Sequence, residues 1–331
     1  MPALATSAFA AFALAAGCAS ESDISRLEYE DSFFQEGTDR VDILWIVDNS
    51  NSMANEQIKV AEGFHEFIQA VGVKEEVDFH LGLVSTDMDL ANAERGLLIG
   101  DPPYLTREDS YAASFMDRVR VGTIGSDKER GLQAALHALT DPAALEHNTD
   151  FLREDAVLAL VFVSDENDCS DDNWLADDQE GSLCYEIDEK LVPTAEFVRA
   201  FQAIKGLEGR VVASSIVGPP VSEGCDASWP GQRYWTVAEE LGGLVADICE
   251  SDYLQIMDDV GSRISEPQRA FFLTHSPVEE SIVVLVDDVE LAPDPVQGWT
   301  FDGALDSINF TGDYVPAFGS VIRVGYDIGG D

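Results

Sequence analysis

The sequence predicts an α/β protein, with a doubly wound, mostly parallel sheet followed by a small all-β C-terminal module. Continuous apolar runs, typical of strands buried on both faces, alternate with segments whose apolar residues repeat at helical spacing. Near Pro267 this alternation stops, and short strand-like runs separated by turn residues follow. We therefore predict one domain over residues 41–266 and a β-rich module over residues 267–331.

The chain begins with a predicted export signal. The run ALATSAFAAFALAAGC is apolar and rich in small residues, and it is too short to cross a membrane as a helix. It ends in Ala15-Ala16-Gly17-Cys18, which resembles the lipobox of bacterial lipoproteins, in which the Cys is acylated. The resemblance implies a signal peptide over residues 1–17 and a lipid on Cys18. An ordinary secretory peptide is the alternative, and both interpretations predict export.

Residues 18–40 are polar and acidic and show no apolar periodicity, so we expect them to form a flexible tether. Ala19, rather than Asp, follows Cys18. In the best-known sorting rule for lipoproteins, such a residue favours the outer membrane. We therefore expect an outer-membrane lipoprotein of the cell envelope that contacts the membrane only through its N-terminal lipid.

The formal net charge of -44 results from 63 Asp and Glu against 19 Lys and Arg. So negative a field repels nucleic acid and anionic lipid surfaces, and we exclude nucleic acid as a partner. A solvated acidic surface explains most of these carboxylates. A few of them, at particular places in the fold, are candidates for binding divalent cations.

The domain over residues 41–266 begins with the apolar strand VDILWIVD, and the next segment places Ile58, Ala61, Phe64 and Phe67 on one helical face. The later elements repeat these two patterns. We predict strands over residues 41–48, 77–86, 156–165 and 210–218, and helices over residues 56–71, 129–139, 194–204, 234–243 and 253–264. The C-terminal module contains strand-like segments at 269–277, 281–291, 307–312 and 320–328, and we assign it no separate role.

Two of the most apolar strands end in a carboxylate, Asp48 and Asp165. In an open doubly wound sheet, ligands bind beyond the carboxyl ends of the strands, so both carboxylates meet if the two strands are neighbours. Ser50 and Ser52 add hydroxyls at alternate positions after Asp48. Oxygen ligands without His or Cys predict Mg2+, with Mn2+ or Ca2+ possible, rather than zinc or copper. The alternative is a strand-end turn capped by Asp and Ser side chains.

The pattern Asp48-x-Ser50-x-Ser52 after an apolar strand resembles the metal-ion-dependent adhesion site of von Willebrand factor type A domains. Ser126, five residues before Gly131, matches the position of the family's Thr ligand, and Asp165 matches its last Asp. The resemblance covers residues 41–265 and implies hydroxyl ligands from the Ser residues and partly water-mediated contacts from the Asp residues. It also implies that an acidic residue of a partner protein completes the coordination. Thr123 is an alternative to Ser126.

Other acidic residues lie near the predicted site. Thr86 and Asp87 end the second strand, and Glu166 follows Asp165, so these three residues are candidates for a second shell around the cation. A turn is an equally good interpretation of Thr86 and Asp87. The acidic run that begins at Asp165 offers ligands for a second ion, Ca2+, although most such runs are only solvated. Its candidate ligands are Glu166, Asn167, Asp168, Asp171 and Asp172.

Four Cys residues remain once Cys18 is assigned to lipid. Outside the cytoplasm an even number of Cys indicates disulfides, and three pairings are possible. Sequence order favours Cys169–Cys184 and Cys225–Cys249. A zinc site of four thiolates would need closely spaced Cys pairs, which the sequence lacks.

These features predict a non-enzymatic protein for metal-dependent binding or adhesion to a protein partner. The five His residues are scattered, and the sequence has no nucleophile elbow, P-loop or dinucleotide-binding glycine motif. One alternative is a metal-dependent hydrolase that uses the same carboxylates, with Asp87 or Glu166 as general base. The other is a structural protein of envelope assembly whose site holds no ion.

Overall fold

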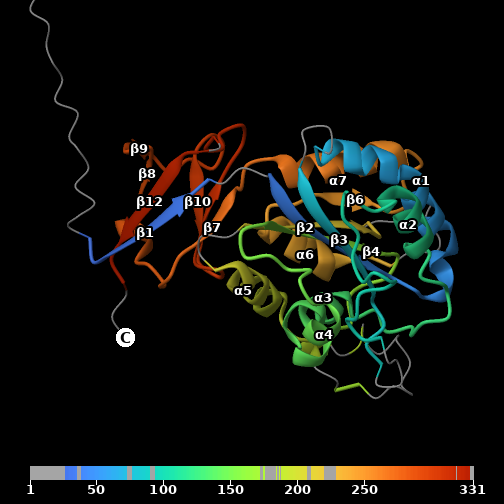
Figure 1. The fold of residues 1–331 in the computed structure, drawn as a ribbon. Coiled ribbons are helices and arrows are strands. Elements are labelled where there is room, and N and C mark those ends of the chain that lie inside the picture. The colour runs from blue at the N-terminus through green and yellow to red at the C-terminus, as the bar shows by residue number, and fades with distance from the viewer. Residues whose placement is uncertain are drawn as a thin grey trace, which may run out of the picture.

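The structure is a computed structural model of the 331-residue chain (Figure 1). It describes residues 27–35, 39–72, 77–89, 94–171, 174–175, 184, 186, 188–206, 210–219, 229–317 and 319–328. The predicted signal peptide and Cys18 therefore lie outside the described residues. Among the helices it describes, none combines the length and the apolar character needed to cross a membrane.

The first domain is built on a sheet of five parallel strands in the order β3-β2-β4-β5-β6. Every residue of β4 and β5 is buried, because helices cover both faces of the sheet. This confirms the predicted doubly wound parallel sheet. The strands are β2 (Arg40–Val47), β3 (Asp78–Ser85), β4 (Val157–Ser164), β5 (Val211–Val217) and β6 (Val245–Asp247).

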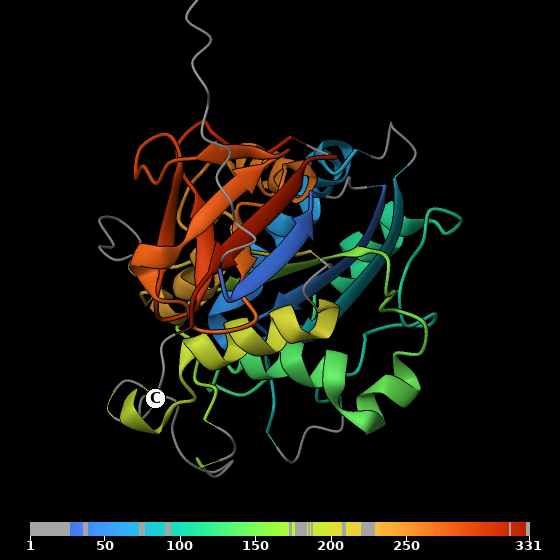
Figure 2. The same ribbon diagram turned by 90° about the vertical axis from the view of Figure 1, so that its left-hand side faces the viewer.

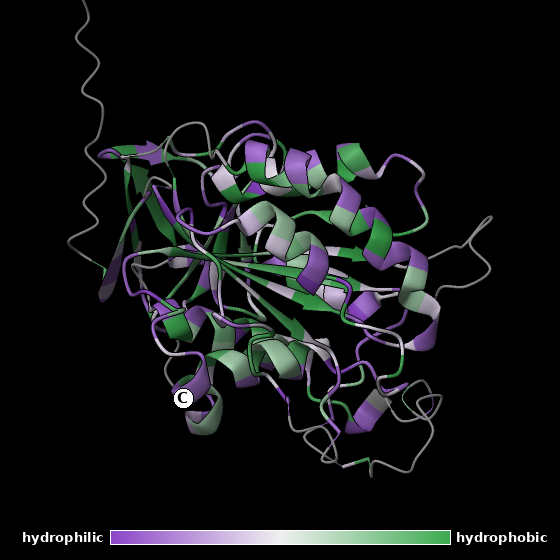
Figure 3. Cartoon of the chain, turned by 45° about the vertical axis from the view of Figure 1, so that its right-hand side comes forward, coloured by the Kyte–Doolittle hydropathy of each residue, from purple (hydrophilic) through white to green (hydrophobic). Residues whose placement is uncertain are grey.

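Two layers of helices enclose this sheet (Figures 1 and 3). The helices α1 (Ala54–Ala70), α2 (Tyr111–Arg118) and α7 (Tyr253–Ser265) share one apolar core with the first face of the sheet. The other face packs against α3 (Gly131–Thr140), α5 (Thr194–Lys205) and α6 (Gln232–Glu240), and α4 (Pro142–His147) packs against α3. Short 3-10 helices are η2 (Asn51–Met53), η5 (Asp188–Lys190) and η6 (Glu279–Ser281).

Every strand and helix predicted for residues 41–266 is present, with ends that differ by a few residues. The prediction missed β6, α2 and α4. Each of these is short, and α2 buries Phe115 alone, so none shows enough apolar periodicity to be detected.

The C-terminal module consists of two small antiparallel sheets (Figure 2). Their apolar faces meet in a separate core that includes Phe271, Trp299, Ile308 and Ile322. One sheet has the order β10-β11-β7, with β10 (Trp299–Asp302), β11 (Ser307–Phe310) and β7 (Ala270–Phe272). The other has the order β1-β12-β8-β9, with β1 (Tyr29–Phe34), β12 (Val321–Tyr326), β8 (Val283–Val286) and β9 (Val289–Leu291).

Strand β1 corrects part of the predicted tether over residues 18–40. It pairs with β12 along its whole length, from Tyr29 opposite Tyr326 to Phe34 opposite Val321. Phe33 enters the core of the module, and Asp31 accepts hydrogen bonds from Thr274 and Tyr326. The free edge of β12 supplies the backbone partners that this polar segment lacks by itself. The other domain boundaries stay predictions.

Candidate metal centre

The candidate site lies at the carboxyl edge of the central sheet, where β2 and β4 end side by side (Figure 1). After β2 the chain continues to β3 on one side, and after β3 it returns to β4 on the other side of β2. This reversal of strand order between β2 and β4 is the place where open α/β sheets bind ligands. Asp48 directly follows β2 and Asp165 directly follows β4.

Asp48 is fully buried and is held by neighbouring donors. The backbone N–H of Ser50 donates to its Oδ1 at 2.6 Å, and the Ser164 hydroxyl donates to its Oδ2 at 2.6 Å. Burial raises the pKa of Asp48, and the hydrogen bonds from Ser164 and Ser50 oppose that shift. The carboxylate is therefore fixed in position at the end of the strand.

The two serines of the motif connect Asp48 to Asp165. The hydroxyl oxygens of Ser50 and Ser52 are 3.2 Å apart, and Ser52 Oγ donates to Asp165 Oδ1 at 3.0 Å. Burial, followed by the charge of Asp48, raises the pKa of Asp165 to about 7. The structure thus brings together four of the five predicted ligands, two carboxylates and two hydroxyls.

Ser126, the fifth predicted ligand, lies on the adjacent loop. Its N–H donates to Asp87 Oδ2 at 3.3 Å, and its Oγ accepts from the N–H of Lys128 at 3.2 Å. The loop is attached to the motif, since the N–H of Gly125 donates to the carbonyl of Asn49 at 2.9 Å. Asp87 thus holds the Ser126 loop, and half-buried Thr123 lies on the same loop.

Gln57 on α1 joins the same two loops. Its Nε2 donates to the carbonyl of Asp48 at 2.9 Å and to the carbonyl of Gly122 at 2.8 Å. It is almost completely buried, so these two backbone carbonyls are paired away from solvent.

Glu129 is a candidate site residue that the sequence analysis missed. It is fully buried and accepts a hydrogen bond from the Thr86 hydroxyl. Burial and then the charge of Asp48 raise its pKa well above the usual range. Thr86, a predicted second-shell residue, therefore reaches the site through Glu129. The segment DKER resembles a solvated first turn of a helix, so no sequence signal identifies Glu129 as buried.

The oxygen atoms at this edge fit a hard divalent cation. At this edge of the described structure Asn49 Oδ1 is buried without a hydrogen-bond partner, and the carboxyl groups of Asp48 and Glu129 can pair with each other only while one of them carries a proton. A cation would satisfy these oxygen atoms. Among the described residues, no three His, Cys, Asp or Glu side chains are grouped in a way that would by itself hold a metal ion. A cation here would therefore depend on the Ser hydroxyls as well as on Asp48 and Asp165.

The disulfide Cys169–Cys184 is present and anchors a loop beside the site. The N–H of Cys169 donates to the carbonyl of Glu129 at 2.6 Å. Cys249 is also disulfide-bonded, and its predicted partner, Cys225, lies outside the described residues.

Two of the candidate ligands for a second ion at this loop form ion pairs with arginines instead. Asp168 pairs with Arg233 at 3.1 Å, and Asp171 pairs with buried Arg130 at 3.3 Å. Asp172, another candidate, lies outside the described residues.

Exposed apolar side chains lie on the loops around the candidate site. Ile124, on the Ser126 loop, is 98% exposed. The side chain of Trp229 is 57% exposed, and its backbone N–H donates to the carbonyl of Asp165 at 2.7 Å. Isolated exposed apolar residues are common, but these two flank the same cluster of oxygen atoms.

The sequence matches no family model and no curated protein. Similar solved structures include a von Willebrand factor type A protein from Catenulispora acidiphila, with 12% identity and a TM-score of 0.40, covering 91% of this chain and 65% of that one. Manganese-loaded TRAP protein from Plasmodium vivax has 10% identity and a TM-score of 0.38, covering 91% of this chain and 98% of that one.

The pilus adhesin SpaC from Lactobacillus rhamnosus GG has 12% identity and a TM-score of 0.36, covering 90% of this chain and 40% of that one. This chain thus spans less than two thirds of the Catenulispora and Lactobacillus chains. At such identities and TM-scores the similarity is distant, so the fold assignment rests on the strand order and register given above.

Proposed function

We propose that this protein is a non-enzymatic binding protein of the cell envelope that holds one divalent cation and uses it to bind a carboxylate of a partner protein. The observation that carries this proposal is the hydrogen bond from Ser52 Oγ to Asp165 Oδ1 at 3.0 Å. It joins the loop after β2 to the end of β4, which supports a single site built from residues that follow both strands.

In this proposal Ser50 and Ser52 coordinate the cation through their hydroxyls, and Asp48 and Asp165 neutralise its charge directly or through water. Ser126, or Thr123 on the same loop, adds a further hydroxyl. Oxygen-only ligands suit Mg2+, and also Mn2+ or Ca2+. When bound, the cation supplies a positive charge at an edge that otherwise repels carboxylates.

The partner would offer one Asp or Glu side chain to the cation and apolar contacts to the surrounding loops. Ile124 and Trp229 are the side chains we expect to contact it, because large apolar groups at the centre of an interface contribute most to affinity. Export through the N-terminal signal, with lipid on Cys18 in the outer membrane, is part of the same proposal.

Thermal melting of the purified protein with Mg2+, Mn2+ or Ca2+ tests the cation site. A cation that binds only the folded state adds about 2.7 kcal/mol at 100 times its Kd. We expect a saturable rise in Tm that Ser52→Ala abolishes. Ser110→Ala is the matched control, because Ser110 is exposed and its side chain makes no capping hydrogen bond to α2.

Bound Mn2+ also allows carboxylate binding to be tested, with acetate in place of the partner's side chain. The ion enhances the relaxation of protons of water molecules that exchange at it. Acetate that replaces a bound water should reduce this enhancement in the wild type. The proposal fails if none of the three cations raises Tm in the wild type, even with acetate present.

A further inference from the structure

The turn between β10 and β11, at residues 302–307, lies against the ends of α5 and α6. Arg199 on α5 donates a hydrogen bond to the carbonyl of Ala304, and Leu305 packs into the helix-covered core of the first domain. Cavities adjoin this turn: one of about 550 Å³ beside α6 and one of about 370 Å³ beside α5. The contact between module and domain at this turn is therefore bordered on two sides by pockets open to solvent.

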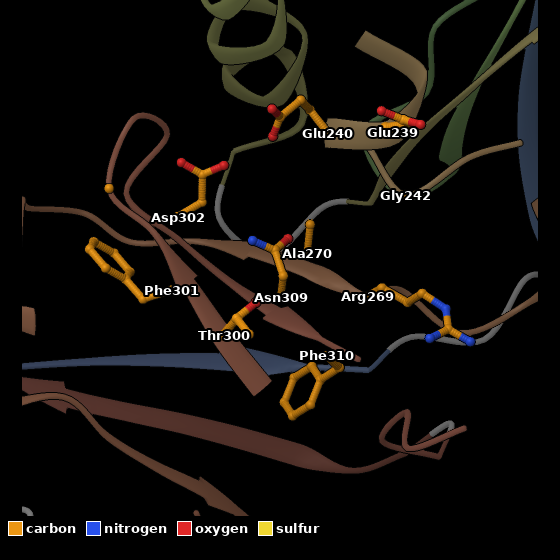
Figure 4. A pocket seen from close by; sticks show the side chains of 11 residues that line it. Glu239, Glu240, Gly242, Arg269, Ala270, Thr300, Phe301, Asp302, Asn309 and Phe310 are labelled. Atoms are coloured by element: carbon orange, nitrogen blue, oxygen red, sulfur yellow. The ribbon is translucent and has the colours of Figure 1, made fainter. Parts of the chain in front are cut away.

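Two of the carboxyl groups that line the larger cavity face each other. Glu240, at the end of α6, and Asp302, at the end of β10, point toward one another (Figure 4), so that a proton on either carboxyl can be shared with the other. Asp302 is fixed within its turn, because its Oδ1 accepts from the N–H groups of Ala304 at 2.8 Å and Leu305 at 3.3 Å.

A hydrogen bond between two carboxyl groups requires a proton on one of them. Burial, and then the charge of Asp302, raise the pKa of Glu240 to about 7. This proton is therefore lost near neutral pH, and the two ionised groups then repel each other.

The other charged groups around the cavity do not compensate this repulsion. Glu239, the neighbour of Glu240 on α6, adds a further negative charge. Arg269 is the one basic residue among the described residues that line the cavity. Its guanidinium donates to the carbonyl of Gly312 at 2.9 Å and points away from both carboxyl groups (Figure 4).

We propose that the contact between Glu240 and Asp302 is a pH-dependent joint, which holds the β10–β11 turn on α6 in mild acid and releases it above neutral pH. Release separates the turn from α6 and gives the module more freedom relative to the first domain. The bond from Arg199 and the packing of Leu305 keep the two parts attached. This proposal is independent of cation binding, because the joint is formed by α6 and the module.

Amide hydrogen exchange of the full-length chain between pH 5.5 and 8.5 tests the joint. The reporters are the amides of Ala304 and Leu305, which Asp302 holds in the turn, with rates divided by the intrinsic rate at each pH. We expect their protection to fall on the order of tenfold between pH 6 and pH 8, as Glu240 loses its proton. Amides in the middle of α1 serve as the reference for global unfolding.

Two variants separate the joint from general effects of pH. In Glu240→Gln the amide donates to Asp302 at every pH, so protection should be high and independent of pH. Glu239→Gln removes the neighbouring charge on the same helix and should keep the wild-type fall. Protection that stays constant in the wild type overturns the proposal, as does a fall that persists in Glu240→Gln. The wild-type profile decides the question even if a variant does not fold.

Discussion

Asp42 lies near the start of strand β2, and Asp48 directly follows its end. Both are fully buried, but the charged groups around Asp42 are basic and those around Asp48 are acidic. Asp42 accepts from Arg153 Nε at 2.7 Å, and Lys205 Nζ lies 3.8 Å from its Oδ2. Asp48 is held by serines and lies near the carboxyl groups of Asp165 and Glu129. A buried carboxylate needs a compensating charge, which the protein supplies at Asp42 and which a bound cation would supply at Asp48.

Asp42→Asn should strongly destabilise the protein, because it leaves the buried Lys205 ammonium without its carboxylate and leaves Arg153 with only the exposed Asp78 as an ion-pair partner. Breaking a buried pair from one side costs about 3–5 kcal/mol in the free energy of unfolding, measured by urea denaturation in EDTA. Asp78→Asn is the control: Asp78 also pairs with Arg153, at 2.8 Å, but is 54% exposed, so its loss should cost less than about 1 kcal/mol. Similar losses in both variants would show that the Asp42 network is not the stronger one.

Glu129→Gln should weaken cation binding while changing the stability of the cation-free protein by less than about 1 kcal/mol. Without a cation, burial and the charge of Asp48 raise the pKa of Glu129 and so favour its protonated form, which an amide resembles in shape and charge. A cation beside the Glu129 carboxyl would displace its proton to solvent and gain a charged ligand, which Gln cannot provide.

We expect the Kd for Mn2+, measured by calorimetry, to rise at least about tenfold in Glu129→Gln, the equivalent of about 1.4 kcal/mol. Glu154→Gln, at an exposed position, should leave it unchanged. An unchanged Kd in Glu129→Gln would place Glu129 outside the coordination of the cation.

The ionisation of Asp165 should make cation affinity increase with pH up to about pH 7 and should add no further increase above it. The carboxyl of Asp165 titrates near 3.9 in an unfolded chain, and its pKa in the cation-free folded protein is about 7. Between these values the folded protein binds more protons, so Asp165 makes cation-free stability fall as pH rises. A cation requires the ionised Asp165 carboxylate, so through this group alone each pH unit below 7 should weaken binding by about tenfold.

Calorimetry with Mn2+ at several pH values between 5.5 and 8.5, in buffers of different ionisation enthalpy, measures both the affinity and the protons released. Asp165 should release about one proton per cation at low pH and none well above pH 7, and Glu129 should release a further proton wherever its carboxyl is still protonated. Binding that neither depends on pH nor releases protons would contradict the role given to Asp165.

Sequence patterns predicted the parts of this fold that repeat. Buried strands such as β4 are uniformly apolar, and their order along the chain places Asp48 and Asp165 at one edge. Glu129 could not be identified, because its burial comes from contacts with Thr86 and the segment after β4, which are distant in sequence. The sequence places Ser126 on the loop before α3, but its bond to Asp87 depends on how two loops meet. The composition of each loop by itself does not reveal contacts between loops that are distant in sequence.

Strand β1 was missed for a related reason, and two adjacent residues test its role. In YEDSFF the acidic residues obscure the alternation that places Phe33 in the core of the module, with 4% exposure, and leaves Phe34 51% exposed. Phe33→Ala should cost about 3–5 kcal/mol of the module's stability, through lost burial and the cavity that remains. Phe34→Ala should cost less than about 1 kcal/mol, because that side chain is half in solvent already.

Urea denaturation, monitored by hydrogen exchange of the β12 amides, measures the difference in module stability between the two variants. In Phe33→Ala the amides of β12 that pair with β1 should lose protection before the strands of the central sheet do, because each part has its own core. If residues 29–34 were a tether, as their composition suggests, both substitutions would leave stability and exchange unchanged. A large effect of Phe33→Ala alone would establish that the N-terminal segment is part of the module.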